Sequence, residues 1–231
     1  MFHVREIPEC LDSYKALPID TAYFTGFTEK QLEKPVNEFI QTTSYDYYWI
    51  CSDDVIANRP AFDLIERGLS KHDIVTGYDF NPDGSGNLCL CDKPLLARFP
   101  TGLKDYPWMS GAYFDAYPGE YVPTTYVPFI FSAIKRDVWL EVPYATYSVL
   151  PAWFSQFFLT AKGSYWRMTR PIRGWANDYN FSYKLQKKGI KAYAVKGARM
   201  EHLGSSVFRP VAYHLNLGEV KPSVELVRCA S

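Results

Sequence analysis

The chain has 231 residues, a length that favours one large domain, and 47% of them are apolar, which is enough for a hydrophobic core. Its 25 basic and 25 acidic side chains cancel to a formal net charge of zero, which argues against a nucleic-acid-binding function. The sequence has no long apolar run and no signal-peptide pattern, and its five cysteines are irregularly spaced. We therefore expect a reduced, cytoplasmic protein without a membrane span.

The first third of the chain predicts alternating helices and strands, as a βα-type sheet requires. In chain order these are a helix at 8–17, a strand at 19–25, a helix at 33–43, a strand at 45–51, a helix at 60–69 and a strand at 73–79. The 45–51 strand has the strongest pattern because its residues are almost all apolar or aromatic, which is typical of a strand covered on both faces.

The rest of the chain is less regular. Residues 80–128 contain many prolines and tyrosines, which predict loops and short strands in a substrate-facing region. Regular elements then return as a strand through Phe131, a short helix near 135–137, a helix at 178–188 ended by Gly189, and a strand at 191–200. Residues 162–174 are rich in Gly, Arg and Lys and predict a mobile loop, while the tail beyond 210 has no clear pattern.

Two adjacent carboxylates, Asp53 and Asp54, directly follow the 45–51 strand. Ligands of open α/β sheets bind outside the carboxyl ends of strands. Adjacent carboxylates are costly there unless a cation neutralises them, and a divalent metal that bridges phosphates would do so. The simpler alternative is a solvated turn that caps the next helix.

A second acidic site opens the 178–188 helix. Asp178 is preceded by Asn177, and an acidic residue at this position is commonly a helix cap. The functional alternative makes Asp178 a general base within reach of an acceptor hydroxyl, with Trp175 nearby to stack on a sugar. A third group, Glu201-His202-Leu203-Gly204, follows the 191–200 strand and offers His202 as a neutral imidazole ligand.

The order of these motifs resembles that of the GT-A glycosyltransferases, and most closely the large inverting family known as family two. The matching segments are YYWICSDDV, FSAIKRDVW, GWANDYNFSYKLQKKGIKAYAV and EHLG, and the likeness extends over residues 8–204. It implies one α/β domain of the GT-A (Rossmann-like) type, with a mixed, mainly parallel sheet flanked by helices. Residues 1–79 would form a nucleotide-binding half, 80–210 an acceptor-binding half, and 211–231 a C-terminal tail.

The resemblance also implies roles for the candidate residues. Asp54 would bind Mn²⁺ or Mg²⁺, and His202 would be a ligand of this metal or of the diphosphate of a nucleoside-diphosphate sugar. As a metal ligand, His202 favours Mn²⁺. Asp53 would lie beside the ribose or the sugar, and Asp178 would be the general base. Ser52 stands where the family usually has the first Asp of its motif, so the ribose contact differs from the family pattern. The family's usual first strand is missing here or is reduced to Phe2-His3-Val4-Arg5.

The predicted loop before the Asp178 helix is expected to close over the donor diphosphate. Lys162, Arg167, Arg170 and Arg173 lie in it, with Trp175 just beyond. Arg170, Arg173 and Trp175 are the donor-binding residues that we expect from this region. The alternative is a solvated basic loop.

Three other functions compete with inverting sugar transfer. A retaining GT-A enzyme would use the same fold and metal site. A nucleotidyltransferase that makes sugar nucleotides is disfavoured, because the N-terminal region has no Gly-rich, Lys-bearing phosphate loop. A non-catalytic carbohydrate-binding protein fits the tyrosine-rich middle, but it would not need Asp54, Asp178 and His202 together.

Overall fold

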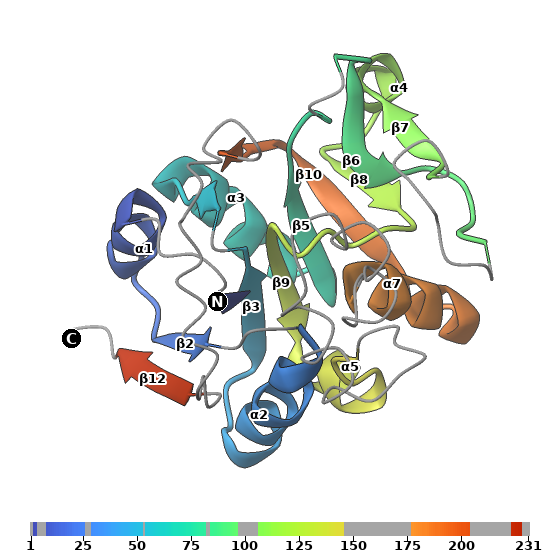
Figure 1. Cartoon of the computed structure of the whole chain (residues 1–231). Coiled ribbons are helices and arrows are strands. Elements are labelled where there is room, and N and C mark those ends of the chain that lie inside the picture. Colours follow the sequence, from blue (N-terminus) through green and yellow to red (C-terminus); the bar gives the residue numbers. More distant parts are fainter. Residues whose placement is uncertain are drawn as a thin grey trace, which may run out of the picture.

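The computed structural model describes residues 2–3, 8–25, 29–52, 54–81, 84–96, 106–145, 177–203 and 223–227. Its helices are α1 (Pro8–Lys15), α2 (Glu29–Thr42), α3 (Arg59–Leu69), α4 (Gly111–Ala116), α5 (Arg136–Glu141) and α7 (Asn177–Lys188) (Figure 1). Its strands are β1 (Phe2–His3), β2 (Thr21–Thr25), β3 (Tyr47–Cys51), β4 (Val55–Ile56), β5 (Ile74–Tyr78), β6 (Asn87–Cys91), β7 (Trp108–Ser110), β8 (Tyr121–Thr124), β9 (Phe131–Lys135), β10 (Ala192–Arg199), β11 (Glu201–His202) and β12 (Ser223–Val227). No helix in these described ranges is long and apolar enough to cross a membrane.

The central sheet has five strands in the order β3-β9-β5-β10-β8, so the predicted α/β class is confirmed. The prediction of a mainly parallel sheet is wrong, because β5–β10 is the one parallel pair and the other three pairs are antiparallel. The physical reason lies in where the chain enters β9. Phe131, its first residue, pairs with Cys51, the last residue of β3, so β9 starts at the carboxyl end of its neighbours and runs back between them.

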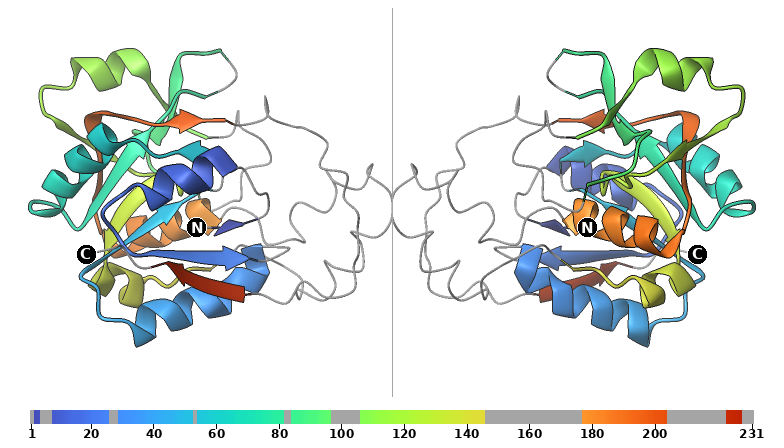
Figure 2. Two further views of the ribbon diagram at one scale, coloured as in Figure 1. Left: turned by 90° about the vertical axis from the view of Figure 1, so that its left-hand side faces the viewer. Right: turned by 90° about the vertical axis from the view of Figure 1, so that its right-hand side faces the viewer.

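A smaller sheet of order β1-β2-β12 lies beside the first one (Figure 2). Phe2–His3 pairs in parallel with β2, which confirms that part of the reduced first strand expected from the sequence. The antiparallel strand β12 was not predicted from the tail. Its five residues carry no turn signal or longer alternation that would distinguish them from a loop.

Both faces of the central sheet are covered, because successive residues of a strand point to opposite faces. Ile74 and Ile134 belong to the core cluster that contains α2, α5 and α7. Their neighbours Val75 and Ala133 belong to the cluster that contains α1 and α3. This two-sided burial explains the almost uninterrupted apolar sequence of β3, as predicted.

Helix α3 shows why the predicted elements form where they do. Asn58 precedes it with extended backbone, and its side-chain oxygen accepts the N–H of Ala61 at 2.8 Å, which caps the first turn. Pro60 stands in that turn, where no backbone donor is needed. Phe62 and Ile65 are 1% and 0% exposed, so the predicted apolar face is the buried one.

Helix α7 ends at a glycine, as predicted. Gly189 has a φ of 71°, and a Cβ added there would meet no atom within 4 Å. The free-energy cost of adding a side chain at Gly189 therefore comes only from its left-handed backbone conformation. We expect Gly189→Ala to lower the free energy of unfolding by about 1 kcal/mol. Gly189→Asn should cost less, because Asn tolerates this conformation, and urea unfolding of both variants measures the difference. Equal losses would contradict this explanation.

The middle of the chain has the predicted short strands and one helix that was not predicted. Strands β6 and β7 form an antiparallel pair, and α4 follows β7 directly. Ser110 caps α4 by accepting the N–H of Tyr113 at 3.2 Å. The sequence signal for this helix is weak because the helix has only 6 residues and buries a single side chain, Phe114.

Candidate functional site

The carboxyl group of Asp178 is held from two sides in the first turn of α7. Its Oδ1 accepts the backbone N–H of Tyr179 at 2.7 Å, and its Oδ2 accepts the hydroxyl of Tyr126. The side chain of Asn177 in turn accepts the N–H of Asp178 at 2.7 Å. Asp178 therefore accepts a backbone N–H of the first helical turn, as a capping residue does. Its second partner, Tyr126, is distant in the sequence.

The segment that carries Tyr126 is fixed against α7 by a serine bridge. The N–H of Val127 donates to Ser182 Oγ at 2.8 Å, and the Ser182 hydroxyl donates to the carbonyl of Asp178 at 2.6 Å. Ser182 and Val127 are fully buried. This bridge aligns the residues after β8 with the first turn of α7, so the contact between Tyr126 and Asp178 is part of the packed core.

Tyr126 belongs to a cluster of four aromatic rings, which we call the aromatic box: Tyr106, Trp108, Tyr126 and Tyr179. The rings of Tyr106 and Trp108 are stacked, with centroids 4.4 Å apart and an angle of 4°. Tyr106 meets Tyr126 and Tyr179 edge-on at 5.7 and 5.4 Å. Tyr106 and Trp108 remain partly exposed, whereas Tyr126 and Tyr179 are each 6% exposed. Two rings of the box, Tyr126 and Tyr179, are therefore buried, and the other two reach the surface.

Burial controls the ionisation of Asp178 and of Tyr126 beside it. Desolvation raises the pKa of Asp178 above its ordinary value, while its hydrogen bonds from Tyr126 and Tyr179 act in the opposite direction. Burial, followed by the nearby charge of Asp178, raises the pKa of Tyr126 well above its ordinary value. Tyr126 therefore stays protonated and remains a hydrogen-bond donor to the carboxylate.

Asp54 occupies a different part of the fold, after β3. It is 5% exposed, and its Oδ1 accepts the hydroxyl of Ser52. The N–H of Leu203 donates to its carbonyl at 2.8 Å, and His202 pairs with Val55 in the β4–β11 ladder. The backbone of 201–203 thus lies beside the Asp54 turn, which is the neighbourhood that the sequence predicts for these two segments.

The carboxyl edge of the sheet carries a further charged pair that was not predicted. Strands β3, β5 and β10 run in the same direction, so their ends lie at one edge. At this edge Arg199 Nε lies 3.3 Å from Asp79 Oδ1. Asp79 follows a strand as Asp54 does, so the same reasoning would have found it. Tyr126 had no such signal, because 52 residues separate it from Asp178.

The remaining predicted residues lie outside the described ranges. These are Arg170, Arg173 and Trp175 with the rest of the 162–174 loop, Asp53, and the side chain of His202. Among the described residues, no group of three or more His, Cys, Asp and Glu side chains is arranged to hold a metal ion. Asp54 is the described member of the predicted metal set, and its buried carboxyl at a strand end suits a cation.

Comparison of the chain with protein-family models, with curated proteins and with solved structures gives no match.

Proposed function

We propose that the protein is a metal-dependent glycosyltransferase of the GT-A type that moves a sugar from a nucleoside-diphosphate sugar to an acceptor hydroxyl. The observation that carries the proposal is the carboxyl of Asp178 in the first turn of α7, which Tyr126 holds in place and desolvation makes more basic. A general base works best when its pKa is closer to the working pH than that of an ordinary carboxylate. Asp178 therefore has the chemistry expected of the base in an inverting transfer.

The proposed reaction is a single displacement. The acceptor hydroxyl gives its proton to Asp178 as its oxygen forms a bond to the anomeric carbon of the donor sugar. The bond between that carbon and the diphosphate oxygen breaks, and the nucleoside diphosphate leaves with the electron pair. Tyr126 keeps the carboxyl oriented, and the stacked rings of Tyr106 and Trp108 offer a flat surface for the acceptor sugar.

Asp54 and His202 are the proposed ligands of Mn²⁺ or Mg²⁺, and the contact between their backbone segments supports this pairing. When bound, such an ion would neutralise the charge that develops on the departing diphosphate. Asp53 is proposed beside the donor ribose or sugar. We propose that the binding site for the donor sugar nucleotide is completed by Trp175, Arg170 and Arg173.

The aromatic box also favours one alternative, a non-catalytic carbohydrate-binding protein. Tyr106 and Trp108 would serve such a protein equally well, since sugar rings stack on flat aromatic faces. A retaining enzyme is the other alternative, in which Asp178 would not remove a proton. Neither alternative requires the pKa of Asp178 to be raised.

A thermal-shift screen with UDP-, GDP-, CDP- and dTDP-sugars, each with and without Mn²⁺, tests the proposal. Binding stabilises the folded state by mass action, so the correct donor raises the melting temperature and does so more strongly with the metal. A shift with free sugars but with none of the nucleotides would support the carbohydrate-binding alternative and overturn the proposed enzyme.

The hydrogen bond from Tyr126 gives a prediction for the pH profile. This bond stabilises the charged form of Asp178 and lowers its pKa, opposing desolvation. Tyr126→Phe removes the bond and keeps the ring, so the pKa of Asp178 should rise further. Because the base must be deprotonated, the acid limb of kcat/KM should move to higher pH in the variant.

A matched control for this measurement is Tyr113→Phe, which changes an exposed ring on α4. It should leave the pH profile of the wild type unchanged. An acid limb at the same pH in Tyr126→Phe and in the wild type would show that the limb belongs to a group other than Asp178.

A further inference from the structure

The ion pair of Asp79 and Arg199 at the carboxyl edge of the sheet, which we call the edge pair, is held in place by several contacts. Nε of Arg199 donates to Oδ1 of Asp79 at 3.3 Å, and the guanidinium carbon lies 4.8 Å from the centre of the Phe80 ring. The carbonyl of Asp79 accepts the N–H of Cys89 at 2.9 Å, and the carbonyl of Arg199 accepts the side-chain amide of Asn58 at 3.2 Å. The backbones and the guanidinium of the pair are therefore fixed by their neighbours.

The edge pair keeps hydrogen-bonding atoms for a ligand. Its internal contact uses Nε of Arg199 and Oδ1 of Asp79, and within the described part of the chain no hydrogen bond engages the Nη atoms of Arg199 or Oδ2 of Asp79. The side chain of Arg199 is 61% exposed and that of Asp79 is 13% exposed. N–H donors and a carboxylate acceptor thus lie next to each other. This set matches two neighbouring sugar hydroxyls, because a hydroxyl group both donates and accepts.

On one side, the edge pair leads to the proposed metal site. Arg199 is the last residue of β10, and His202 follows three positions later in β11, so their Cα atoms are at most about 11 Å apart. His202 pairs with Val55, which directly follows Asp54. The N–H of Leu203 donates to the carbonyl of Asp54 at 2.8 Å. The chain therefore runs from the edge pair directly to the segment that contacts the Asp54 turn.

On the other side, the edge pair leads to Asp178. The thiol of Cys89 donates to the carbonyl of Asp79 at 3.1 Å. Burial, with smaller contributions from the charges of Asp79 and Asp178, raises the pKa of this thiol to about 12, so both carboxyl groups lie near it. Cys91 points to the same face of β6 as Cys89 and belongs to the same cluster as Tyr126. Strand β6 thus connects the edge pair with the hydrogen-bond partner of Asp178.

The proposed reaction places the transferred sugar between the same two positions. Its anomeric carbon is bonded to the diphosphate, which the metal held by Asp54 and His202 would bind. The acceptor hydroxyl that attacks this carbon gives its proton to Asp178. The sugar ring must therefore lie between the metal site and Asp178, and the edge pair has the metal segment on one side and Asp178 on the other.

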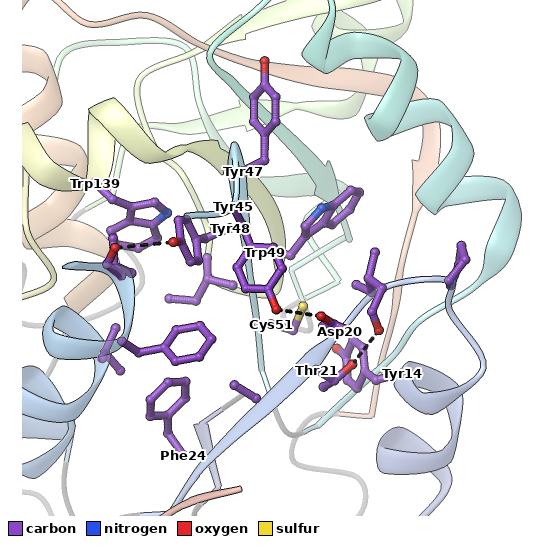
Figure 3. A pocket seen from close by; sticks show the side chains of 17 residues that line it. Tyr14, Asp20, Thr21, Phe24, Tyr45, Tyr47, Tyr48, Trp49, Cys51 and Trp139 are labelled. Carbon is purple, nitrogen blue, oxygen red and sulfur yellow. Dashed lines mark hydrogen bonds between the residues drawn. The ribbon is translucent and has the colours of Figure 1, made fainter. Parts of the chain in front are cut away.

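The cavity of about 430 Å³ between β2 and β3 is a poorer place for a sugar (Figure 3). Most of its lining side chains are apolar or aromatic, and neither member of the edge pair lines it. The hydroxyl of Tyr45 donates to Asp20 at 2.6 Å, and that of Tyr47 donates to the carbonyl of Leu69 at 2.7 Å. These hydroxyls already have protein partners, and sugar hydroxyls buried without partners are costly.

We propose that Asp79 and Arg199 bind two neighbouring hydroxyl groups of the transferred sugar and thereby select the donor. This inference rests on the proposed glycosyltransferase function. The Nη groups of Arg199 donate to one hydroxyl oxygen, and the other hydroxyl donates to Oδ2 of Asp79. Phe80 is a positioning residue, because its ring supports the guanidinium. A sugar with one of these hydroxyls reversed leaves a charged group without its partner, which lowers affinity.

Isothermal titration in the presence of Mn²⁺ tests the proposal without turnover. The probe is whichever of UDP, GDP, CDP and dTDP binds most tightly, together with its glucose, galactose and mannose derivatives, which differ at single hydroxyls. The wild type should prefer one sugar over another. Arg199→Gln and Asp79→Asn should each reduce this preference by on the order of tenfold and leave the Kd of the free diphosphate unchanged. Arg199→Lys keeps the charge but loses the planar set of donors, so it should lose the preference as well.

A matched control is Lys135→Gln. Lys135 forms an ion pair with Asp73, also at 3.3 Å, but at the opposite edge, where β3 and β5 begin. This variant should keep the sugar preference of the wild type. Exposed ion pairs contribute little to folding, so all of these variants should melt close to the wild type.

Each contrary result has its own meaning. An equal loss of affinity for the free diphosphate and for its sugars in Arg199→Gln would assign Arg199 to the diphosphate and overturn the proposal. A sugar preference that is absent from the wild type, or that is unchanged in Arg199→Gln and Asp79→Asn, would also overturn it while the glycosyltransferase function stands. Absence of binding of all four diphosphates to the wild type would instead contradict the proposed function, and this inference with it.

Discussion

Asp178→Asn should lose on the order of 10²–10⁴ in turnover while its fold and donor affinity are kept. The amide oxygen of Asn can accept the N–H of Tyr179, and its NH₂ group can donate to the Tyr126 oxygen, so both contacts of the carboxyl group have a replacement. The donor contacts are assigned to other residues. Proton removal is therefore the one role that the substitution takes away.

The difference in stability between this variant and the wild type should depend on pH. Burial raises the pKa of Asp178, so its charged form weakens the fold. This loss of stability grows as pH rises from about 4, the pKa of Asp in the unfolded chain, through the higher pKa of the folded state. Asn has no such titration. The free energy of unfolding of Asp178→Asn relative to the wild type should therefore become more favourable from low to neutral pH, as measured by urea unfolding.

Two comparisons separate catalysis from capping. Asp178→Ala leaves the Tyr126 hydroxyl and the Tyr179 amide without their acceptor, and it should cost about 1–3 kcal/mol of stability. Asp137→Asn is the matched control, since Asp137 is an exposed acid in the first turn of α5. A rate for Asp178→Asn within a few-fold of the wild type would remove Asp178 from the mechanism and favour the retaining alternative.

Local signals in the sequence were sufficient for most of the elements. The strand β3 and the helix α3 were predicted because burial, capping and turn residues all act within a few positions of one another. The direction of β9 was not predicted, because it depends on the pairing of Phe131 with Cys51, which is far away in the sequence. A periodicity of two identifies a strand and says nothing about the orientation of its partner.

Some residues of the candidate site could likewise be predicted from local patterns, whereas others could not. Asp178 was found because an acid at a helix start is a local pattern, but the tyrosine that holds it is 52 residues away. Asp54 and the 201–203 segment were linked by the order of motifs, and their backbones are in contact.

Removal of the metal should abolish activity, and Mn²⁺ should restore it better than Mg²⁺. Asp54 and His202 are expected to supply one carboxylate and one imidazole, an incomplete set that the donor diphosphate would complete. Loss of the ion removes several kcal/mol of charge stabilisation, which corresponds to about a thousand-fold or more in rate. Excess EDTA followed by titration with Mn²⁺ measures the effect, and full activity in EDTA would refute it.

The position of the ion is tested without relying on turnover. Mn²⁺ alone should bind weakly and should bind more tightly when UDP or GDP is added, which electron paramagnetic resonance of the free ion reports. Asp54→Asn should remove this cooperative binding, since the buried carboxyl loses its charge while Asn can still accept the Ser52 hydroxyl. Asp73→Asn, an exposed acid just before β5, should bind Mn²⁺ and nucleotide as the wild type does. Cooperative binding that persists in Asp54→Asn would move the metal site away from the end of β3, because no neutral amide replaces a carboxylate on Mn²⁺ without loss of affinity.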